Sequence, residues 1–519
     1  MASTTDVVAP ADYKQQALET DIPYGAEDED VVVHRSTLGA LFFWLKSWFI
    51  PGMGMFCESY FVFSIGNITP IFTAEYPDCY KTHKKCSTNL LADQTYYQVV
   101  GIIVGMLTLG YLGDRIGRKW GSVTTAGIMF IGGILLTASG GVTIRGWVIC
   151  FTIAQTIFGY GVGGEYPMAS SSASERAEAS KAMRHRRGEL VVCTFAMQGW
   201  GNFINTIVLI ILLCIFGENH KATATNPYNQ SDLGAVWRLS FGIGLIPVTL
   251  MLLYRIFRLP ESKVWKKEKV KVGTGSPNLL LIKHYWSRLA GTALGWFFWD
   301  VSFYGNKLFQ STFIKIISPN ASLVDTLLWT MLNAGIALVG YYFAAFTIDS
   351  KWMGRMRMQV MGFCWVFVLF LICAAAYTKL IKPDYIHVFQ FLYFFSSFWD
   401  VRGTAHGISA ATGKAGALLA AVLFNYINNQ SKFYVCAFCN LAGLLLTILF
   451  IPNLGALDLR EGDRRWNYLL QGRAAEYHGE AVNPSYLSLW ERLRGAGKYY
   501  SVEADLADEK LGSKPAPVV

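Results

Sequence analysis

The chain has 519 residues, of which 53% are hydrophobic and 16% are charged, whereas about 25% of the residues of a soluble domain are charged. With a mean hydropathy of +0.32 and many separate apolar runs of about 20 residues, this composition excludes an ordinary soluble domain and indicates a bundle of membrane helices. Nucleic acid is not the partner that explains the net charge of +9, because the basic residues lie in short loops between apolar runs, as in membrane proteins.

Both ends of the chain are polar. Residues 1–40 contain an acidic run at positions 27–30, and we expect them to form a disordered cytoplasmic tail. Residues 453–519 contain several basic residues and tyrosines. They are expected to form a second cytoplasmic tail, for which the sequence indicates no role.

Between these tails the apolar runs predict twelve membrane-spanning segments in two groups of six. The predicted segments are 41–73, 94–113, 120–140, 146–167, 189–216, 236–256, 288–313, 324–347, 357–378, 385–399, 403–426 and 433–451. The first bundle occupies 41–256 and the second 288–452, with a polar and basic central loop at 257–287. This arrangement resembles the plan of major facilitators, all-α membrane proteins in which the substrate site lies near the midplane between two six-helix bundles.

Basic residues in the loops set the expected orientation. They gather between segments 2 and 3, between segments 4 and 5, and in the central loop, and these three loops lie on one side of the membrane. If that side is cytoplasmic, both termini are cytoplasmic as well, and the glycosylation sequons at Asn229, Asn320 and Asn429 all lie outside. We therefore expect an integral, multi-pass protein, with the plasma membrane as its location.

Two of the ten cysteines, Cys79 and Cys86, lie in a polar loop that this orientation places outside. In an oxidising compartment they could form a disulfide, and the sequence alone leaves open whether they do. The same loop contains Lys81, Lys84 and Lys85, which is a mild violation of the rule that basic residues stay inside.

A motif rich in glycine and charge, residues 110–119, follows segment 2 and resembles the signature loop of major facilitators. It includes Asp114, Arg115 and Arg118. Asp114 could pair with a basic group or a helix N-terminus across an interface and so hold one gating state; the alternative is a loop of solvated charges. Because the two halves of the chain have a similar plan, a second copy of this motif is expected between segments 8 and 9. Residues 349–355 form a degraded version of it there.

Segment 4 ends in a glycine-rich run in which Gly159, Gly161 and Gly164 match the spacing of a dinucleotide-binding loop. We reject that function because no strand precedes the run and no βαβ unit surrounds it. Glycines in a membrane helix favour close helix packing instead. The run also places Glu165 at membrane depth, where a charge costs about 2.5–3.5 kcal/mol or more and usually has a function.

Glu58 in segment 1, Asp300 in segment 7 and Lys414 in segment 11 are placed at similar depth. Asp300 shares one helix face with Trp296 and Tyr304, which lie four residues before and after it. A lysine can hold an anion and buried carboxylates can carry protons, so the set predicts proton-coupled transport of an anion. The alternative is a set of buried pairs that only hold helices together. No nucleophile–base pair and no metal-ligand cluster stands out, so neither an enzyme nor a metal or cofactor is expected.

Together the motifs resemble the phosphate:proton symporters of fungi and plants over about residues 45–450. The motifs concerned are residues 163–167, 195–199, 296–304 and 403–414. The resemblance implies that phosphate and protons are carried and that the substrate site is lined by Tyr166, Gln198, Trp296, Asp300, Tyr304 and Lys414. It also implies that Glu58 and Glu165 occupy the positions of proton-linked aspartates.

The chain departs from those symporters in ways that affect the expected cargo. Glu58 and Glu165 stand where the symporters have aspartate, and Lys307 adds a positive charge one turn beyond Tyr304. The loop 174–187 is longer than usual, as in the fungal glycerophosphodiester permeases, which have a similar segment 4. Proton-coupled transport of a glycerophosphodiester is therefore the alternative to transport of inorganic phosphate.

The tenth segment is unusually short. It runs from Ile386 to Trp399, which at 1.5 Å per residue is about 21 Å, less than the ~30 Å of a bilayer core. Resemblance to the symporters implies that about 20 residues are missing here, among them an asparagine that contacts substrate. A non-transporting sensor, or an inactive splice or gene-model variant, is therefore a further alternative.

Overall fold

The computed structural model describes residues 37–179, 186–259, 277–350, 352–399, 408–454, 457 and 459–510. Within these ranges the chain is helical and contains no strand, which confirms the all-α prediction. The chain divides into a short unit, Met1–Lys46, and a large unit, Ser47–Val519. Apart from residues 37–46, which begin the first described helix, the residues discussed below belong to the large unit. The tail expected at 1–40 lies almost wholly outside the described residues, and the first described helix begins at Thr37.

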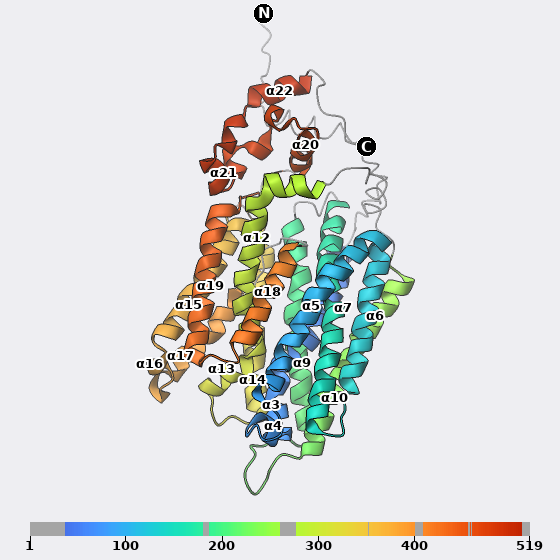
Figure 1. Cartoon of the computed structure of the whole chain (residues 1–519), viewed down its shortest axis with the longest axis vertical. Coiled ribbons are helices and arrows are strands. Elements are labelled where there is room, and N and C mark those ends of the chain that lie inside the picture. Colours follow the sequence, from blue (N-terminus) through green and yellow to red (C-terminus); the bar gives the residue numbers. More distant parts are fainter. Residues whose placement is uncertain are drawn as a thin grey trace, which may run out of the picture. The chain divides into compact units, whose positions relative to one another are not determined.

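The first six predicted segments correspond to helices, the first of them broken at Phe63. The helices are α2 (Thr37–Val62), α3 (Ser64–Glu75), α5 (Thr88–Ile116), α6 (Arg118–Thr137), α7 (Ile144–Ala179), α9 (Arg187–Ile215) and α10 (Gln230–Phe257). Helix α7 packs against both α5 and α6, and α10 packs against α6 and α9 (Figure 1).

Glycines allow the close contact between α7 and α5. A β-carbon added at Gly159 or Gly163 would collide with the backbone of α5, and one added at Gly161 would collide with α6. The glycine-rich run of segment 4 therefore packs helices together, as we predicted when we rejected the dinucleotide-binding alternative.

The second six predicted segments also correspond to helices. These are α12 (Pro277–Leu308) with α13 (Gln310–Ile317), α14 (Leu323–Thr347), α15 (Arg355–Ala375), α17 (Ile386–Ser396), α18 (Ile408–Leu423) and α19 (Asn429–Phe450). Helix α12 packs against α18 and α19, and α15 packs against α19. The two groups of helices meet where α9 contacts α14 and where α5 contacts α18.

Eight of the described helices are long and apolar enough to cross a membrane. The other four predicted segments fall short for identifiable reasons. Helix α12 carries several charged side chains, α18 has 16 residues and α17 has 11. Helix α2 has 26 residues but contains Lys46, Pro51 and Glu58. At 1.5 Å per residue α17 is about 16 Å long. Residues 400–407, which come after Trp399, lie outside the described residues, so the shortness of segment 10 stays a prediction.

The polar C-terminal stretch is folded, whereas we expected only a tail. It forms α20 (Leu459–Leu470), α21 (Leu489–Leu493) and α22 (Val502–Lys510), with short 3₁₀ helices between α20 and α22. Tyr468 and Tyr477 are the large members of its small core. Periodicity failed to reveal this fold because its elements are short and its core holds few side chains.

This C-terminal module docks on the first turns of α12 (Figure 1). Arg288 donates two hydrogen bonds, of 2.8 and 3.0 Å, to the two carboxylate oxygens of Glu491, and Trp286 packs against Trp490. Burial alone would raise the pKa of Glu491, but Arg288 and the hydrogen bonds from Ser488 outweigh it and lower that pKa. The pair therefore stays ionised and ties the module to the helix that carries Trp296, Asp300 and Tyr304.

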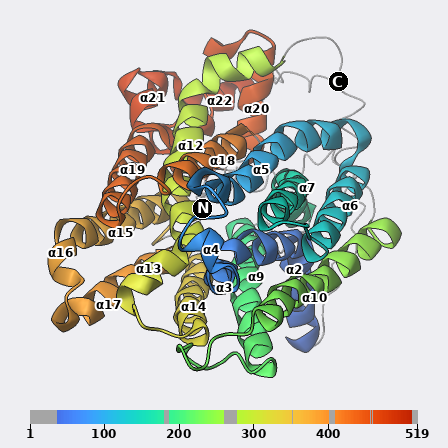
Figure 2. The same ribbon diagram turned by 60° about the horizontal axis from the view of Figure 1, so that its bottom comes forward.

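At the opposite end of the helices a disulfide joins Cys79 to Cys86, which answers the question that the sequence left open. It closes the loop that follows α4 (Pro77–Tyr80). Figure 2, in which this end comes forward, shows α4 beside α3 near the middle of the face and α16 (Tyr377–Leu380) at its edge.

Candidate functional site

Six of the predicted site residues come together between the two groups of helices, and all six are at most 2% exposed. They are Glu58 (α2), Tyr166 (α7), Gln198 (α9), Asp300 and Tyr304 (α12) and Lys414 (α18). We call these residues the central cluster. Their side chains are therefore shielded from solvent.

The part of the cluster on the first six helices is a hydrogen-bond network around one carboxylate. The hydroxyl of Tyr166 donates to Oε1 of Glu58. The amide of Gln198 donates to the same oxygen at 3.1 Å and to the Tyr166 hydroxyl at 3.0 Å. This network fixes Glu58 and leaves a tyrosine hydroxyl at the boundary between the two halves.

The part on the second six helices is an ion pair. Nζ of Lys414 lies 3.0 Å from Oδ2 of Asp300, and both side chains are completely buried. The same ammonium lies 4.4 Å from the ring centre of Tyr166 and 4.3 Å from that of Tyr304, so cation–π attraction adds to the ion pair. The two tyrosine hydroxyls are 3.2 Å apart, which joins the two parts of the cluster.

Local sequence explains how Lys414 reaches Asp300. Gly413 and Gly416 face α12, where an added β-carbon would collide with the ring of Trp296 or with the backbone of Phe297. The two helices can therefore approach closely. Trp296 lies against Gly413, and its indole nitrogen makes no hydrogen bond to any described residue.

Glu165 lies in a different network from its neighbour Tyr166. Arg255 of α10 donates to both of its carboxylate oxygens, at 2.5 and 2.7 Å, and Thr125 of α6 donates to one of them at 2.5 Å. The sequence did not single out Arg255, because it stands at the end of an apolar segment and resembles a loop charge. Its position inside the sixth predicted membrane segment, 236–256, was the feature of the sequence that could have indicated a buried partner for Glu165. Whether Glu165 carries protons stays a prediction.

The predicted gating motif is described only in part. Asp114 and Arg118 lie at the α5–α6 junction, but their side chains are outside the described part of the chain, and Arg115 is exposed over the ring of Tyr111 at 4.6 Å. The counterpart motif between segments 8 and 9 contains Asp349, whose contacts are described. Oδ2 of Asp349 accepts a 2.9 Å hydrogen bond from the backbone N–H of Glu189, in the first turn of α9. A carboxylate of the second half thus caps a helix of the first half.

We expect Asp349→Ala to loosen this contact, because it removes both the cap and a favourable charge at a helix N-terminus, together about 1 kcal/mol. Hydrogen exchange at the first amides of α9 should become roughly five times faster. Asp384→Ala, at an exposed site on the opposite end of the helices, is the matched control and should leave this exchange unchanged. Unaltered exchange in Asp349→Ala would show that the cap does not hold the halves together.

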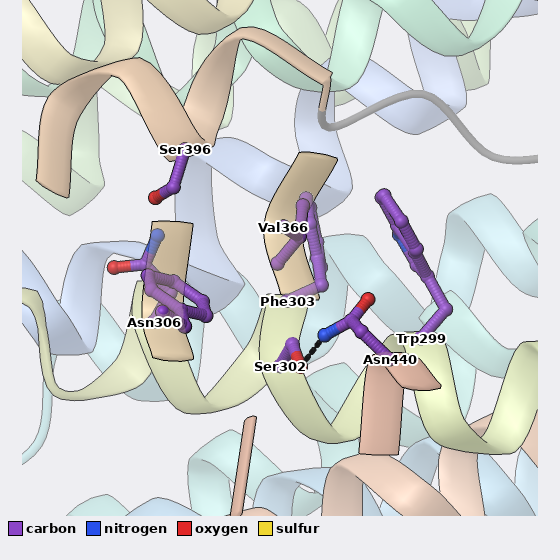
Figure 3. Close-up of a pocket in the computed structure, with 8 residues that line it drawn as sticks. Trp299, Ser302, Phe303, Asn306, Val366, Ser396 and Asn440 are labelled. Carbon is purple, nitrogen blue, oxygen red and sulfur yellow. Dashed lines mark hydrogen bonds between the residues drawn. The ribbon is translucent and has the colours of Figure 1, made fainter. Parts of the chain in front are cut away.

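A cavity lies within the second half, away from the central cluster (Figure 3). Its lining includes Ser302, Asn306, Ser396 and Asn440, and Asn440 donates to Ser302 at 2.5 Å. Ser396 is the last residue of α17. Polar side chains therefore line the space beside the end of the short tenth segment.

These features define a membrane transporter of the major facilitator fold: two groups of helices that meet at a pair of tyrosines beside a buried ion pair. The xylose transporter XylE of E. coli, in the structure bound to 6-bromo-6-deoxy-D-glucose, has the same fold, with a TM-score of 0.62 and 19% identity over 80% of this chain and 97% of XylE. The model of the family "Sugar (and other) transporter" matches residues 48–275. The chain belongs to this family of integral, multi-pass transporters, which are not enzymes.

Among its relatives is glycerophosphoinositol permease 1 of Candida albicans, which is 30% identical over 81% of this chain and 80% of the permease. The glycerophosphoinositol transporter 1 of Saccharomyces cerevisiae is 29% identical over 81% of each protein. The low affinity inorganic phosphate transporter 1 of Petunia hybrida is 28% identical over 80% of this chain and 91% of the transporter.

Proposed function

We propose that the chain carries a phosphate-bearing anion together with protons by alternating access between the two halves. The observation that supports this most directly is the buried pair of Lys414 and Asp300 between two tyrosine rings. An ammonium removed from water requires a counter-charge, and Asp300 supplies it in the absence of cargo. A phosphate group could take over that role if Asp300 accepted a proton.

Coupling follows from charge balance in this mechanism. Phosphate and an ionised Asp300 would together leave the site with excess negative charge around one lysine, which is costly in a medium of low dielectric constant. Protonation of Asp300 removes that excess, so anion and proton bind together. Glu58 is a second carboxylate within the same cluster and extends the proton path, and we propose the same role for Glu165 behind it.

Two observations bear on the cargo. The central cluster has one lysine, two tyrosine hydroxyls and one glutamine amide, which fits inorganic phosphate as the cargo. Glycerophosphodiesters are the second candidate, because two of the relatives are named for glycerophosphoinositol and a third is named a glycerophosphocholine permease. Both cargoes offer the same phosphate group to Lys414.

We also propose the orientation expected from the sequence, with the termini in the cytoplasm and the plasma membrane as location. The disulfide between Cys79 and Cys86 supports it, because disulfides persist in oxidising compartments. Asn229 and Asn320 precede α10 and α14 at the same end of the helices. That end is therefore the outside in this proposal.

Uptake should rise as the external pH falls and collapse when a protonophore is added, because the proton gradient drives the anion inward. Glu58→Gln and Glu165→Gln should each stop uptake or uncouple it from the gradient. Glu75→Gln is a matched control, since Glu75 is also buried in the first bundle but bonds to Trp237, outside the cluster. Uptake that depends on sodium and ignores pH would contradict proton coupling.

A further inference from the structure

The loop closed by the disulfide carries a concentration of positive charge on the face that we propose to be external. Lys81, Lys84 and Lys85 are exposed within it, where short loops normally contain few basic residues. Lys85 is paired with Asp78 at 3.0 Å. Neither Lys81 nor Lys84 forms an ion pair with any residue that the structure describes.

The loop is held in place. The disulfide joins its two ends, and Tyr80, at the end of α4, donates a 2.6 Å hydrogen bond to Gln94 of α5. A basic loop that is fixed in this way keeps its charges at a constant position over the helices, whereas a mobile loop would spread them through the solvent.

A lysine of the second half lies near this loop. Lys315 lies near the end of α13 and is exposed to solvent. Its ammonium lies close enough to that of Lys81 for the two positive charges to repel each other. Helix α3 contacts both α4 and α13, and Figure 2 shows α4 and α13 close to α3 in the middle of this face.

Helix α12, which directly precedes α13 in the chain, connects this face with the central cluster. Lys307 lies on α12 between Tyr304 and the start of α13, and it is 5% exposed. With Gln198 and Asn202 of α9 it lines a narrow cavity between the two halves, which has room for roughly one water molecule. Gln198 belongs to both this cavity and the central cluster.

We propose that Lys81, Lys84 and Lys315 form an anion-collecting mouth, from which the phosphate-bearing substrate passes Lys307 on its way to Lys414. The inference rests on the proposed function, because only an anionic cargo gains from it. Charges of one sign at the opening of a path raise the local concentration of an oppositely charged ligand and accelerate its association. They need not contact the cargo in its final position.

The test is the association rate of phosphate with the full-length protein in nanodiscs, followed by tryptophan fluorescence in stopped flow. At about 10 mM ionic strength, where charges act over roughly 30 Å, Lys81→Gln/Lys84→Gln should associate with phosphate about three- to tenfold more slowly than wild type. The dissociation rate should not change. At 0.5 M salt the two proteins should converge.

Lys379→Gln/Lys382→Gln is the matched control, because these lysines are exposed on the same face but on and beside α16, at its edge (Figure 2). The control should associate at the wild-type rate. The proposed anion-collecting mouth would be disproved if Lys81→Gln/Lys84→Gln and wild type associated with phosphate at equal rates at low salt. Equal slowing in the control would disprove it as well. Failure of wild type to bind phosphate or a glycerophosphodiester would contradict the proposed function instead.

Discussion

Replacing Lys414 with alanine is expected to abolish phosphate uptake, with a loss of at least about 100-fold, while the protein still inserts into the membrane. The ammonium is completely buried beside Asp300. Truncation of one partner of a buried charge pair at a binding interface costs about 2–5 kcal/mol of binding free energy, and about 3 kcal/mol corresponds to a 100-fold loss. Uptake of labelled phosphate into proteoliposomes, normalised to inserted protein, measures the effect.

Two further variants separate binding from stability. Lys432→Ala removes another lysine of the second half, 6% exposed and outside the cluster, and should retain most of the uptake. Lys414→Ala/Asp300→Ala removes both charges, so it should recover stability lost in the single variant but not transport. Normal uptake by Lys414→Ala would exclude this lysine from the substrate site.

The second large effect concerns the tenth segment. Insertion of about 20 residues with the sequence of a symporter segment 10 between Trp399 and Asp400 is expected to raise uptake severalfold over the chain as it stands, because a short helix must thin the bilayer or fail to span it. The structure describes only 11 residues in α17. Uptake assays on both proteins at equal insertion measure the difference.

The structure describes the space beside the end of the short tenth segment. The cavity there (Figure 3) is lined by polar side chains, among them Ser396 at the end of α17, together with aromatic and aliphatic ones.

The short tenth segment leaves Lys414 paired with Asp300. A failure to span could have displaced Lys414 from Asp300, yet the two side chains are 3.0 Å apart. The proposal is therefore that transport is slowed by a missing wall of the site and not by a misplaced lysine. Full-rate uptake by the unaltered chain would disprove this and would exclude the inactive-variant and sensor alternatives.

Much of the fold could be predicted because most of the apolar runs in the sequence form one helix each. The four-residue spacing of Trp296, Asp300 and Tyr304 placed them on one helix face, and charges at membrane depth identified Glu58, Asp300 and Lys414 as members of a common site. The partners were harder to predict. Which carboxylate meets Lys414 depends on how α12 and α18 pack, and that depends on glycines whose contacts a single sequence does not specify.

Other features could not be predicted for physical reasons. Arg255 binds Glu165 from a distant helix, and its charge at a segment end looks like that of a solvated loop. The C-terminal module has short elements and a small core, so its polar composition concealed its fold. The cap on α9 depends on Asp349 reaching across two halves, which no local pattern describes.

The most direct test of the proposed function is uptake of labelled phosphate into proteoliposomes under an imposed pH gradient, with and without excess glycerophosphoinositol. We predict uptake that follows the gradient and stops with a protonophore. Strong inhibition by glycerophosphoinositol, with uptake of the labelled diester, would identify the organophosphate as the preferred cargo, and weak inhibition would identify inorganic phosphate. If neither compound enters, even after segment 10 is extended, the chain is not a transporter of phosphate-bearing anions.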